Sequence, residues 1–106
     1  MASPDRVISS AVSGCLMSAL QGVEQGAVDS GLPRESAAKF ARQALLGTAL
    51  LLEDLGDSPA VLKDRVASPG GTTIAGLAAL EAHAVRGSLI RAVDHAVKDA
   101  GEGREK

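Results

Sequence analysis

Aromatic side chains are nearly absent from this sequence of 106 residues. Phe40 is the single aromatic residue, and the sequence has neither tryptophan nor tyrosine. Base-stacking surfaces for single-stranded nucleic acid and cages for methylated lysine are both built from aromatic rings. The composition therefore excludes both kinds of site.

An excess of charge of either sign is also missing. The sequence has 11 lysine and arginine residues against 13 aspartate and glutamate residues, for a formal net charge of −2. A protein that holds nucleic acid electrostatically needs a dense basic surface. No nucleic-acid partner is expected.

Cysteine and histidine are too sparse for a metal site. Cys15 is the only cysteine, so no internal disulfide is possible and nothing indicates an oxidising compartment. Cys15 falls on an apolar helical stripe, where a buried, space-filling role is expected. His83 and His95 have no Cys or His partner at metal-binding spacing, so no metal ion is expected.

Long hydrophobic runs are absent as well. The longest apolar run, residues 44–52, is interrupted by Gly47 and Thr48 and is far shorter than the roughly 20 residues that span a bilayer. Asp5 and Arg6 precede a mixed segment, which is not the pattern of a secretory signal. We expect no membrane association and a cytoplasmic location.

The residues that are present predict one all-α domain over residues 1–106. Hydrophobic residues make up 45% of the chain, which is too many for a disordered protein. Apolar residues recur at three-and-four spacing, and no alternating strand pattern occurs. Glycine and proline divide the chain into about five helices. These are expected from Pro4 to near Gly31, from Pro33 to about Leu55, from Pro59 to near Val66, from Thr72 to near His83, and from Val85 to Ala100, followed by a frayed tail at residues 101–106.

The lengths of the helices favour a homodimer or higher oligomer. Two helices of about 22 to 27 residues would be roughly 33 to 40 Å long, whereas a compact domain of 100 residues has a radius of gyration of about 13 Å. The end of the second helix is apolar on more than one face, with Ala44, Leu45, Leu46, Ala49, Leu50, Leu51 and Leu52. A second copy could cover this surface. The alternative is one kinked helix wrapped by the others.

The segment at residues 68–73 has the most chemical character. Its sequence is Ser-Pro-Gly-Gly-Thr-Thr, and a helix is expected to begin at Thr72. Glycine lets backbone N–H groups turn outward, and the N–H groups of a helix start attract carboxylate or phosphate. The candidate substrate-binding residues are Ser68, Gly70, Gly71, Thr72 and Thr73. On these residues alone, a plain turn followed by a helix cap is the other interpretation, and no lysine follows to make a phosphate loop.

The same segment resembles the dimerisation domain of pyrroline-5-carboxylate reductase, the enzyme that completes proline biosynthesis. The similarity is clearest over residues 62–77, Leu-Lys-Asp-Arg-Val-Ala-Ser-Pro-Gly-Gly-Thr-Thr-Ile-Ala-Gly-Leu. It extends to Gly-Leu-Pro at 31–33, Gln-Ala-Leu-Leu-Gly at 43–47 and Arg-Gly-Ser-Leu-Ile at 86–90. The resemblance covers most of the chain from about Gly22 to Val97.

The resemblance implies a fold and a ligand. Members of the family form an intertwined helical dimer, in which the segment matching residues 68–73 holds the carboxylate of the pyrroline ring. The residue matching Thr73 is placed to hydrogen-bond the imine nitrogen. The family uses NADPH or NADH through a separate Rossmann domain. This sequence has no Gly-x-Gly-x-x-Gly motif after a strand, so no cofactor site is expected in it.

Two departures from the family pattern affect the ends of the domain. The stretch that the family places beside the nicotinamide is proline-containing, whereas residues 9–15 read Ser-Ser-Ala-Val-Ser-Gly-Cys. The Gly-Gly-Phe break before the last helix is replaced by His83, Ala84 and Val85. A nicotinamide contact is therefore not expected, and the final hinge is expected to differ.

Three functions follow from these observations. The first is a stand-alone dimerisation domain with a pocket for a small imino- or amino-acid carboxylate, such as proline or pyrroline-5-carboxylate, and no reductase activity alone. The second is a fragment or subunit of an NAD(P)H-dependent pyrroline-5-carboxylate reductase. The third is a small cofactor-free enzyme, such as a cyclase, that reuses the pocket. The carboxylates of Glu53, Asp54 and Asp64 have no specified partner, so no catalytic residue is nominated.

Overall fold

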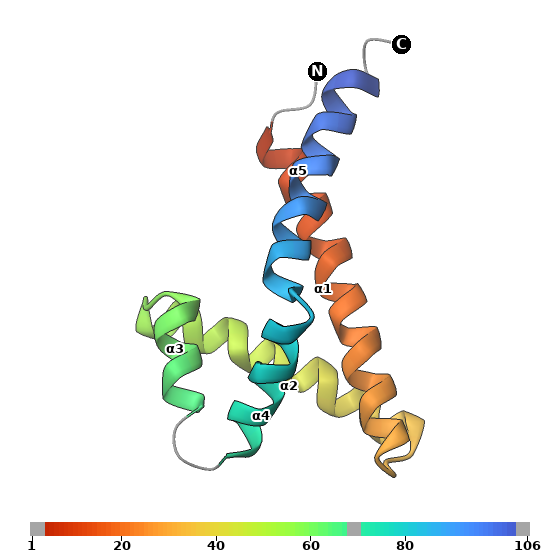
Figure 1. Cartoon of the computed structure of the whole chain (residues 1–106), viewed down its shortest axis with the longest axis vertical. Coiled ribbons are helices and arrows are strands. Elements are labelled where there is room, and N and C mark those ends of the chain that lie inside the picture. The colour runs from red at the N-terminus through yellow and green to blue at the C-terminus, as the bar shows by residue number, and fades with distance from the viewer. Residues whose placement is uncertain (1–3, 68–70, 104–106) are drawn as a thin grey trace. The chain divides into compact units, whose positions relative to one another are not determined.

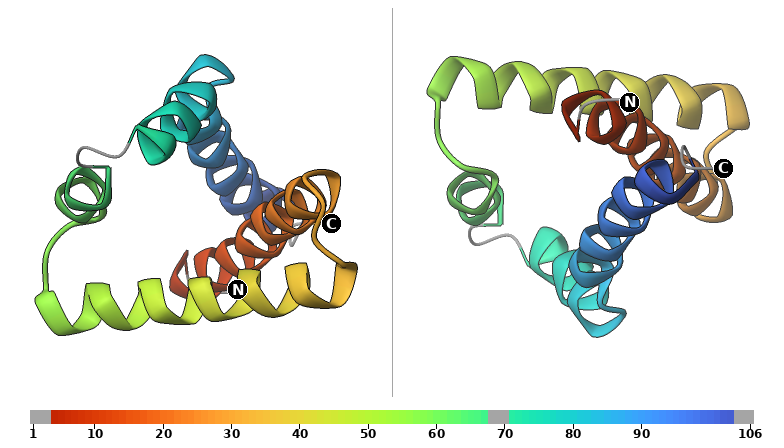
Figure 2. Two further views of the ribbon diagram at one scale, coloured as in Figure 1. Left: turned by 90° about the horizontal axis from the view of Figure 1, so that it is seen from below. Right: turned by 90° about the horizontal axis from the view of Figure 1, so that it is seen from above.

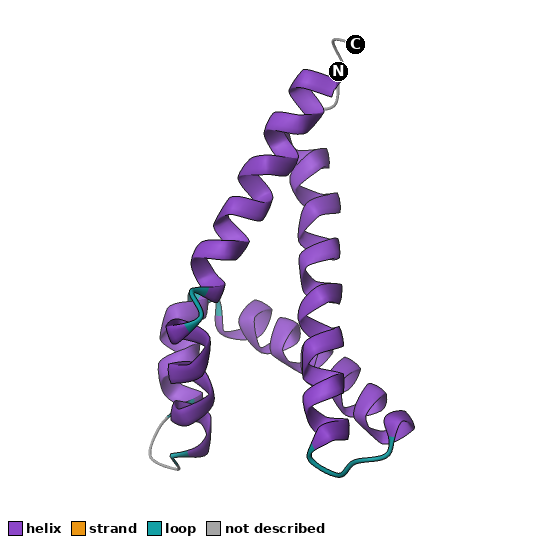
Figure 3. Cartoon of the chain, turned by 45° about the vertical axis from the view of Figure 1, so that its right-hand side comes forward, coloured by secondary structure: helices purple, strands orange, loops and turns teal. Residues whose placement is uncertain are grey.

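Five helices make up the chain in the computed structural model, which describes residues 4–67 and 71–103 (Figure 1). The helices are α1 (Pro4–Asp29), α2 (Arg34–Leu55), α3 (Pro59–Val66), α4 (Thr72–Ala82) and α5 (Val85–Gly103). No strand occurs among these residues (Figure 3). The prediction of an all-α fold with five helices is confirmed.

Glycine and proline end and start the helices as the sequence predicts. Gly31 and Gly56 follow α1 and α2 with φ of 116° and 66°, a region that side chains with a Cβ rarely enter. The N–H of Gly56 donates to the carbonyl of Leu52, which caps α2. Before α3, the Oγ of Ser58 accepts a 3.3 Å hydrogen bond from the N–H of Val61, and Pro59 occupies the first helical position.

The last helix differs from the prediction. It continues to Gly103, whereas residues 101–106 were expected to be frayed. Gly101 lies inside α5 without a positive φ, so it extends the helix instead of ending it. Residues 104–106 lie outside the described part of the chain.

The chain divides into two compact units. One consists of Met1–Ala19 with Leu80–Lys106, and the other is Leu20–Ala79. In the first unit, the amino-terminal part of α1 lies beside the carboxyl-terminal part of α5 (Figures 1 and 3). Half-buried positions recur every four residues on α1, at Val7, Ala11 and Cys15, and α5 also has half-buried positions at Val93 and Val97. Cys15 is thus half-buried in an apolar stripe, less covered than predicted.

The second unit contains every fully buried hydrophobic residue of the described chain. These are Ala37 and Ala41 on α2 and Leu62 on α3. In the same unit, the end of α1 leads into the start of α2 through a short turn (Figure 2). The alternative to a dimer was a kinked second helix wrapped by the other helices of the same chain. Because α2 has only these two buried residues, it is not wrapped in this way.

One described helix is long and apolar enough to cross a bilayer by length and composition. It is the span Asp5–Asp29 in α1, with a mean hydropathy of 1.2. Serine, glycine and charged residues are dispersed through it, so no uninterrupted apolar run marks it in the sequence. Length and composition alone are weak evidence for a membrane-spanning helix, because a core helix of a soluble protein or a signal sequence meets the same criterion. The absence of membrane association therefore stays a prediction.

Candidate functional site

The predicted ligand-binding segment lies at the start of α4. Ser68 and Gly70 are outside the described residues, whereas Gly71, Thr72 and Thr73 are described. Gly71 has a φ of 79°, and its carbonyl accepts a 2.9 Å hydrogen bond from the N–H of Ala75. This bond closes the first turn of α4, so Gly71 is the N-cap residue immediately before the helix.

The start of α4 has the general features of a helix amino terminus. In any α-helix, the first N–H groups have no acceptor within the helix and carry the positive end of its dipole. In α4, which begins at Thr72, the first N–H groups are those of Gly71, Thr72, Thr73 and Ile74. The first turn contains no acidic residue, so no carboxylate of its own turn neutralises this end. Thr72 and Thr73 are exposed and add two hydroxyl groups.

No acid–base or metal site accompanies this turn in the described part of the chain. The described residues contain no group of three or more His, Cys, Asp or Glu side chains that could hold a metal ion. His83 follows the end of α4, as predicted, and His95 lies in the middle of α5. The polar groups described at the start of α4 are backbone N–H groups and the hydroxyls of Thr72 and Thr73.

The junction between α4 and α5 is made without glycine. Ala84 adopts a left-handed conformation, with a φ of 53°, and is the one non-glycine residue with positive φ in the described chain. Its N–H donates to the carbonyl of Glu81 at 3.1 Å, and its carbonyl accepts from the N–H of Ser88 at 2.9 Å. An exposed ion pair between Glu81 and Arg86, 3.7 Å apart, spans the junction. The final hinge thus has a conformation that glycine adopts more easily.

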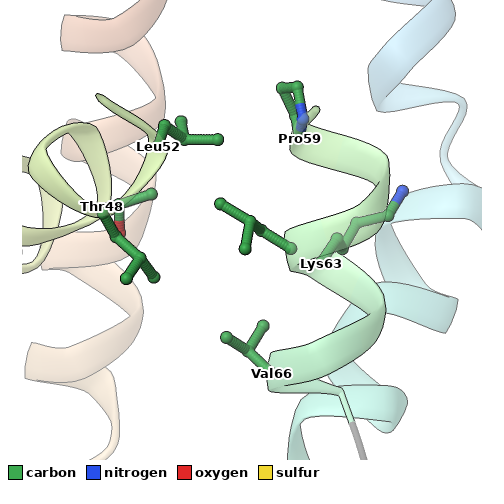
Figure 4. A pocket seen from close by; sticks show the side chains of 7 residues that line it. Thr48, Leu52, Pro59, Lys63 and Val66 are labelled. Carbon is green, nitrogen blue, oxygen red and sulfur yellow. The ribbon is translucent and has the colours of Figure 1, made fainter. Parts of the chain in front are cut away.

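A groove between α2 and α3 is a feature that the sequence analysis missed. It has a volume of about 310 Å³ and lies within the second unit (Figure 4). Its lining is almost entirely apolar and consists of Thr48, Leu51, Leu52, Pro59, Leu62, Lys63 and Val66. Gly71, Thr72 and Thr73 do not line it. The leucine pair in α2 and the four-residue spacing of Leu62 and Val66 in α3 were the available signals.

Most large hydrophobic side chains remain exposed in the single chain. They include Phe40, Leu46, Leu50 and Leu51 on α2, with exposed fractions between 41% and 65%. The chain exposes 8087 Å² in total.

Comparison with known proteins identifies the relatives of this chain. The family model described as pyrroline-5-carboxylate reductase dimerisation matches residues 6–103. The pyrroline-5-carboxylate reductase of Synechocystis sp. is 46% identical over 83 residues, which are 78% of this chain and 31% of the relative. The reductase of Arabidopsis thaliana is 46% identical over 84 residues, covering 79% of this chain and 30% of the relative. The reductase of Escherichia coli is 42% identical over 74 residues, which are 70% of this chain and 28% of the relative.

These matches concern one region of the relatives. The chain spans about three tenths of the length of the curated reductases that it matches. The matched region includes Gly71, Thr72 and Thr73 as well as the groove between α2 and α3. The resemblance first noted at residues 62–77 is therefore confirmed over nearly the whole sequence, and the chain belongs to the pyrroline-5-carboxylate reductase dimerisation family.

Proposed function

We propose that this chain is the dimerisation and substrate-holding part of a pyrroline-5-carboxylate reductase system. Two copies associate through their exposed helical faces, and the turn before α4 holds a small imino- or amino-acid carboxylate. The observation that carries the proposal is the start of α4. There, a left-handed Gly71 precedes N–H groups without helical acceptors and two exposed threonine hydroxyls.

The carboxylate is the part of the ligand that this turn can recognise. An anion at a helix start gains from the N–H donors and from the positive end of the helix dipole together. The hydroxyl of Thr73 can donate to, or accept from, a second polar atom of the ligand, such as a ring nitrogen. Ser68 and Gly70, which the family resemblance adds, lie outside the described residues. Proline and pyrroline-5-carboxylate both have a carboxylate next to a ring nitrogen.

The chain's own residues do not fit a nicotinamide cofactor. The sequence has no Gly-x-Gly-x-x-Gly motif, and its described residues form no strand from which such a motif could lead into a helix. A hydride donor, NADPH or NADH, would have to be held by another polypeptide segment. We therefore expect no reductase activity from this chain alone. That it covers about three tenths of its relatives favours its acting as part of a larger enzyme.

The proposal is tested by adding L-proline to the isotope-labelled chain and recording its amide NMR spectrum. The amide signals of Gly71, Thr72 and Thr73 should shift and saturate, because their N–H groups receive the carboxylate. Pyrrolidine, which has the ring nitrogen without the carboxylate, is the matched control and should leave these signals in place. Equal shifts with both compounds, or shifts confined to other helices, would contradict a carboxylate site at this turn.

A second test addresses the absence of activity. The purified chain, mixed with NADPH and pyrroline-5-carboxylate, should give no loss of absorbance from NADPH oxidation above the rate without protein. Turnover by the chain alone would show that it carries a hydride donor site that its sequence does not indicate.

A further inference from the structure

An ion pair between Asp57 and Arg65 connects the two ends of α3. Asp57 precedes the helix, in the three-residue connection from α2, and Arg65 lies in the last turn of α3. The Nη2 of Arg65 is 3.5 Å from Oδ2 of Asp57. The Arg65 side chain is 61% exposed and that of Asp57 is 34% exposed, so the carboxylate is the more covered partner. The pair ties the end of α3 back to the connection from which the helix starts.

Burial holds the start and the middle of α3 but not its last turn. The Oγ of Ser58 caps the first turn, and Leu62 in the middle of the helix is only 6% exposed. In the last turn the apolar side chain is Val66, which is 57% exposed. An apolar side chain that stays largely in water contributes little to holding its helix in place. The contact from Arg65 to Asp57 therefore has a larger share in fixing the end of α3.

We infer that the Asp57–Arg65 ion pair positions the turn before α4 for its ligand. The inference rests on the function proposed above and names two positioning residues that act on its site from α3. Gly71 follows Ala67 by four residues, which span at most about 14 Å of chain. Both residues belong to the same compact unit. Where α3 ends therefore limits where Gly71 and the start of α4 can lie.

The pair acts through the fraction of chains whose turn is in place to bind. A surface ion pair changes an equilibrium by a small factor, about two to three. When a smaller fraction of chains has a binding-competent turn, the apparent dissociation constant rises by the same factor. The N–H groups of Gly71, Thr72 and Thr73 are the same with or without the pair. Loss of the pair should therefore lower the apparent affinity and leave the bound state unchanged.

The inference is tested by titrating L-proline into isotope-labelled Asp57→Asn, Arg65→Gln and the double variant. Each single substitution should weaken binding about two- to threefold. The double variant should bind no more weakly than either single variant, because both substitutions break the same contact. At saturation, the amide signals of Gly71, Thr72 and Thr73 should coincide with those of the unchanged chain. Unchanged binding by the single variants, or losses that multiply in the double variant, would overturn the inference.

Two further measurements separate the kinds of failure. Asp94→Asn is the matched control, because it breaks the exposed 3.0 Å ion pair of Asp94 with Lys98 in α5, which belongs to the other unit. This variant should bind L-proline as the unchanged chain does, and an equal loss would show a general effect of charge. If the unchanged chain binds and the Asp57 and Arg65 variants bind equally well, only this inference is wrong. If the unchanged chain gives no shifts at Gly71, the proposed function is wrong and this inference fails with it.

Discussion

The side chain of Arg34 donates a 2.7 Å hydrogen bond from Nη2 to Oε1 of Gln25, which joins the first residue of α2 to the last turns of α1. Gln25 in turn donates from Nε2 to Oδ1 of Asp29, also at 2.7 Å. The three residues form a chain of hydrogen bonds across the turn that contains Gly31 and Pro33. These bonds link the end of α1 to the start of α2.

Replacing Arg34 by alanine should weaken this corner. The bonds are exposed, so the loss in the free energy of unfolding should be about 0.5 to 1 kcal/mol. Urea denaturation followed by circular dichroism measures it. Arg42→Ala, in the middle of the same helix, is the control and should change the stability by less than half as much. Equal effects would mean that the bond to Gln25 adds nothing.

Gly71→Ala should destabilise the chain because Gly71 has a φ of 79°. An alanine in this left-handed region costs about 1 to 2 kcal/mol. Gly14→Ala is the matched control, since Gly14 lies inside α1, has no positive φ and has open space around its Cβ position. That change should instead raise stability by up to about 1 kcal/mol. Thermal unfolding of both variants measures these changes in stability. A loss of stability of similar size in both variants would contradict the left-handed conformation of Gly71.

Ala84→Gly should stabilise the α4–α5 junction. Relief of the left-handed strain at Ala84 gains about 1 to 2 kcal/mol, and the added freedom of glycine in the unfolded chain offsets about 0.5 to 1 kcal/mol of it. Ala78→Gly, six residues earlier and inside α4, should lower the stability by about 1 kcal/mol. Opposite shifts in the melting temperature are expected. If both substitutions lower it, Ala84 is not left-handed in solution.

Thr73→Val should weaken binding of L-proline about three- to tenfold, because valine keeps the shape of threonine and removes the hydroxyl group. Thr73→Ser, which keeps the hydroxyl, should bind within about twofold of the unchanged chain. Isothermal titration calorimetry or the amide shifts described above measure the affinity. Unchanged binding by the valine variant would mean that the Thr73 hydroxyl does not contact the ligand and that only the backbone N–H groups hold it.

The helices could be predicted from the sequence because local signals define them. Gly31, Gly56 and the Ser58–Pro59 pair each act within a few residues, and all three mark helix ends or starts in the structure. Burial could not be predicted in the same way. Periodicity shows that the leucines of α2 are apolar, but not whether anything covers them, and in the single chain Leu50 is 56% exposed.

Only part of the candidate site could be predicted from the sequence. The glycine pair before a helix start predicted a turn, and Gly71 has a positive φ. The groove between α2 and α3 was missed because it combines residues from two helices whose relative placement no local pattern specifies. Ala84 was missed because alanine gives no signal for a left-handed conformation; only its place in the family pattern indicated a changed hinge.

The central claim is that a second copy covers the apolar surface that one chain leaves exposed. Sedimentation velocity at micromolar concentration, with dilution as the variable, tests this most directly. The account predicts a species of at least twice the chain mass of 10.7 kDa, which dissociates only on dilution or with denaturant. A single species of 10.7 kDa at every concentration, folded by circular dichroism, would contradict it.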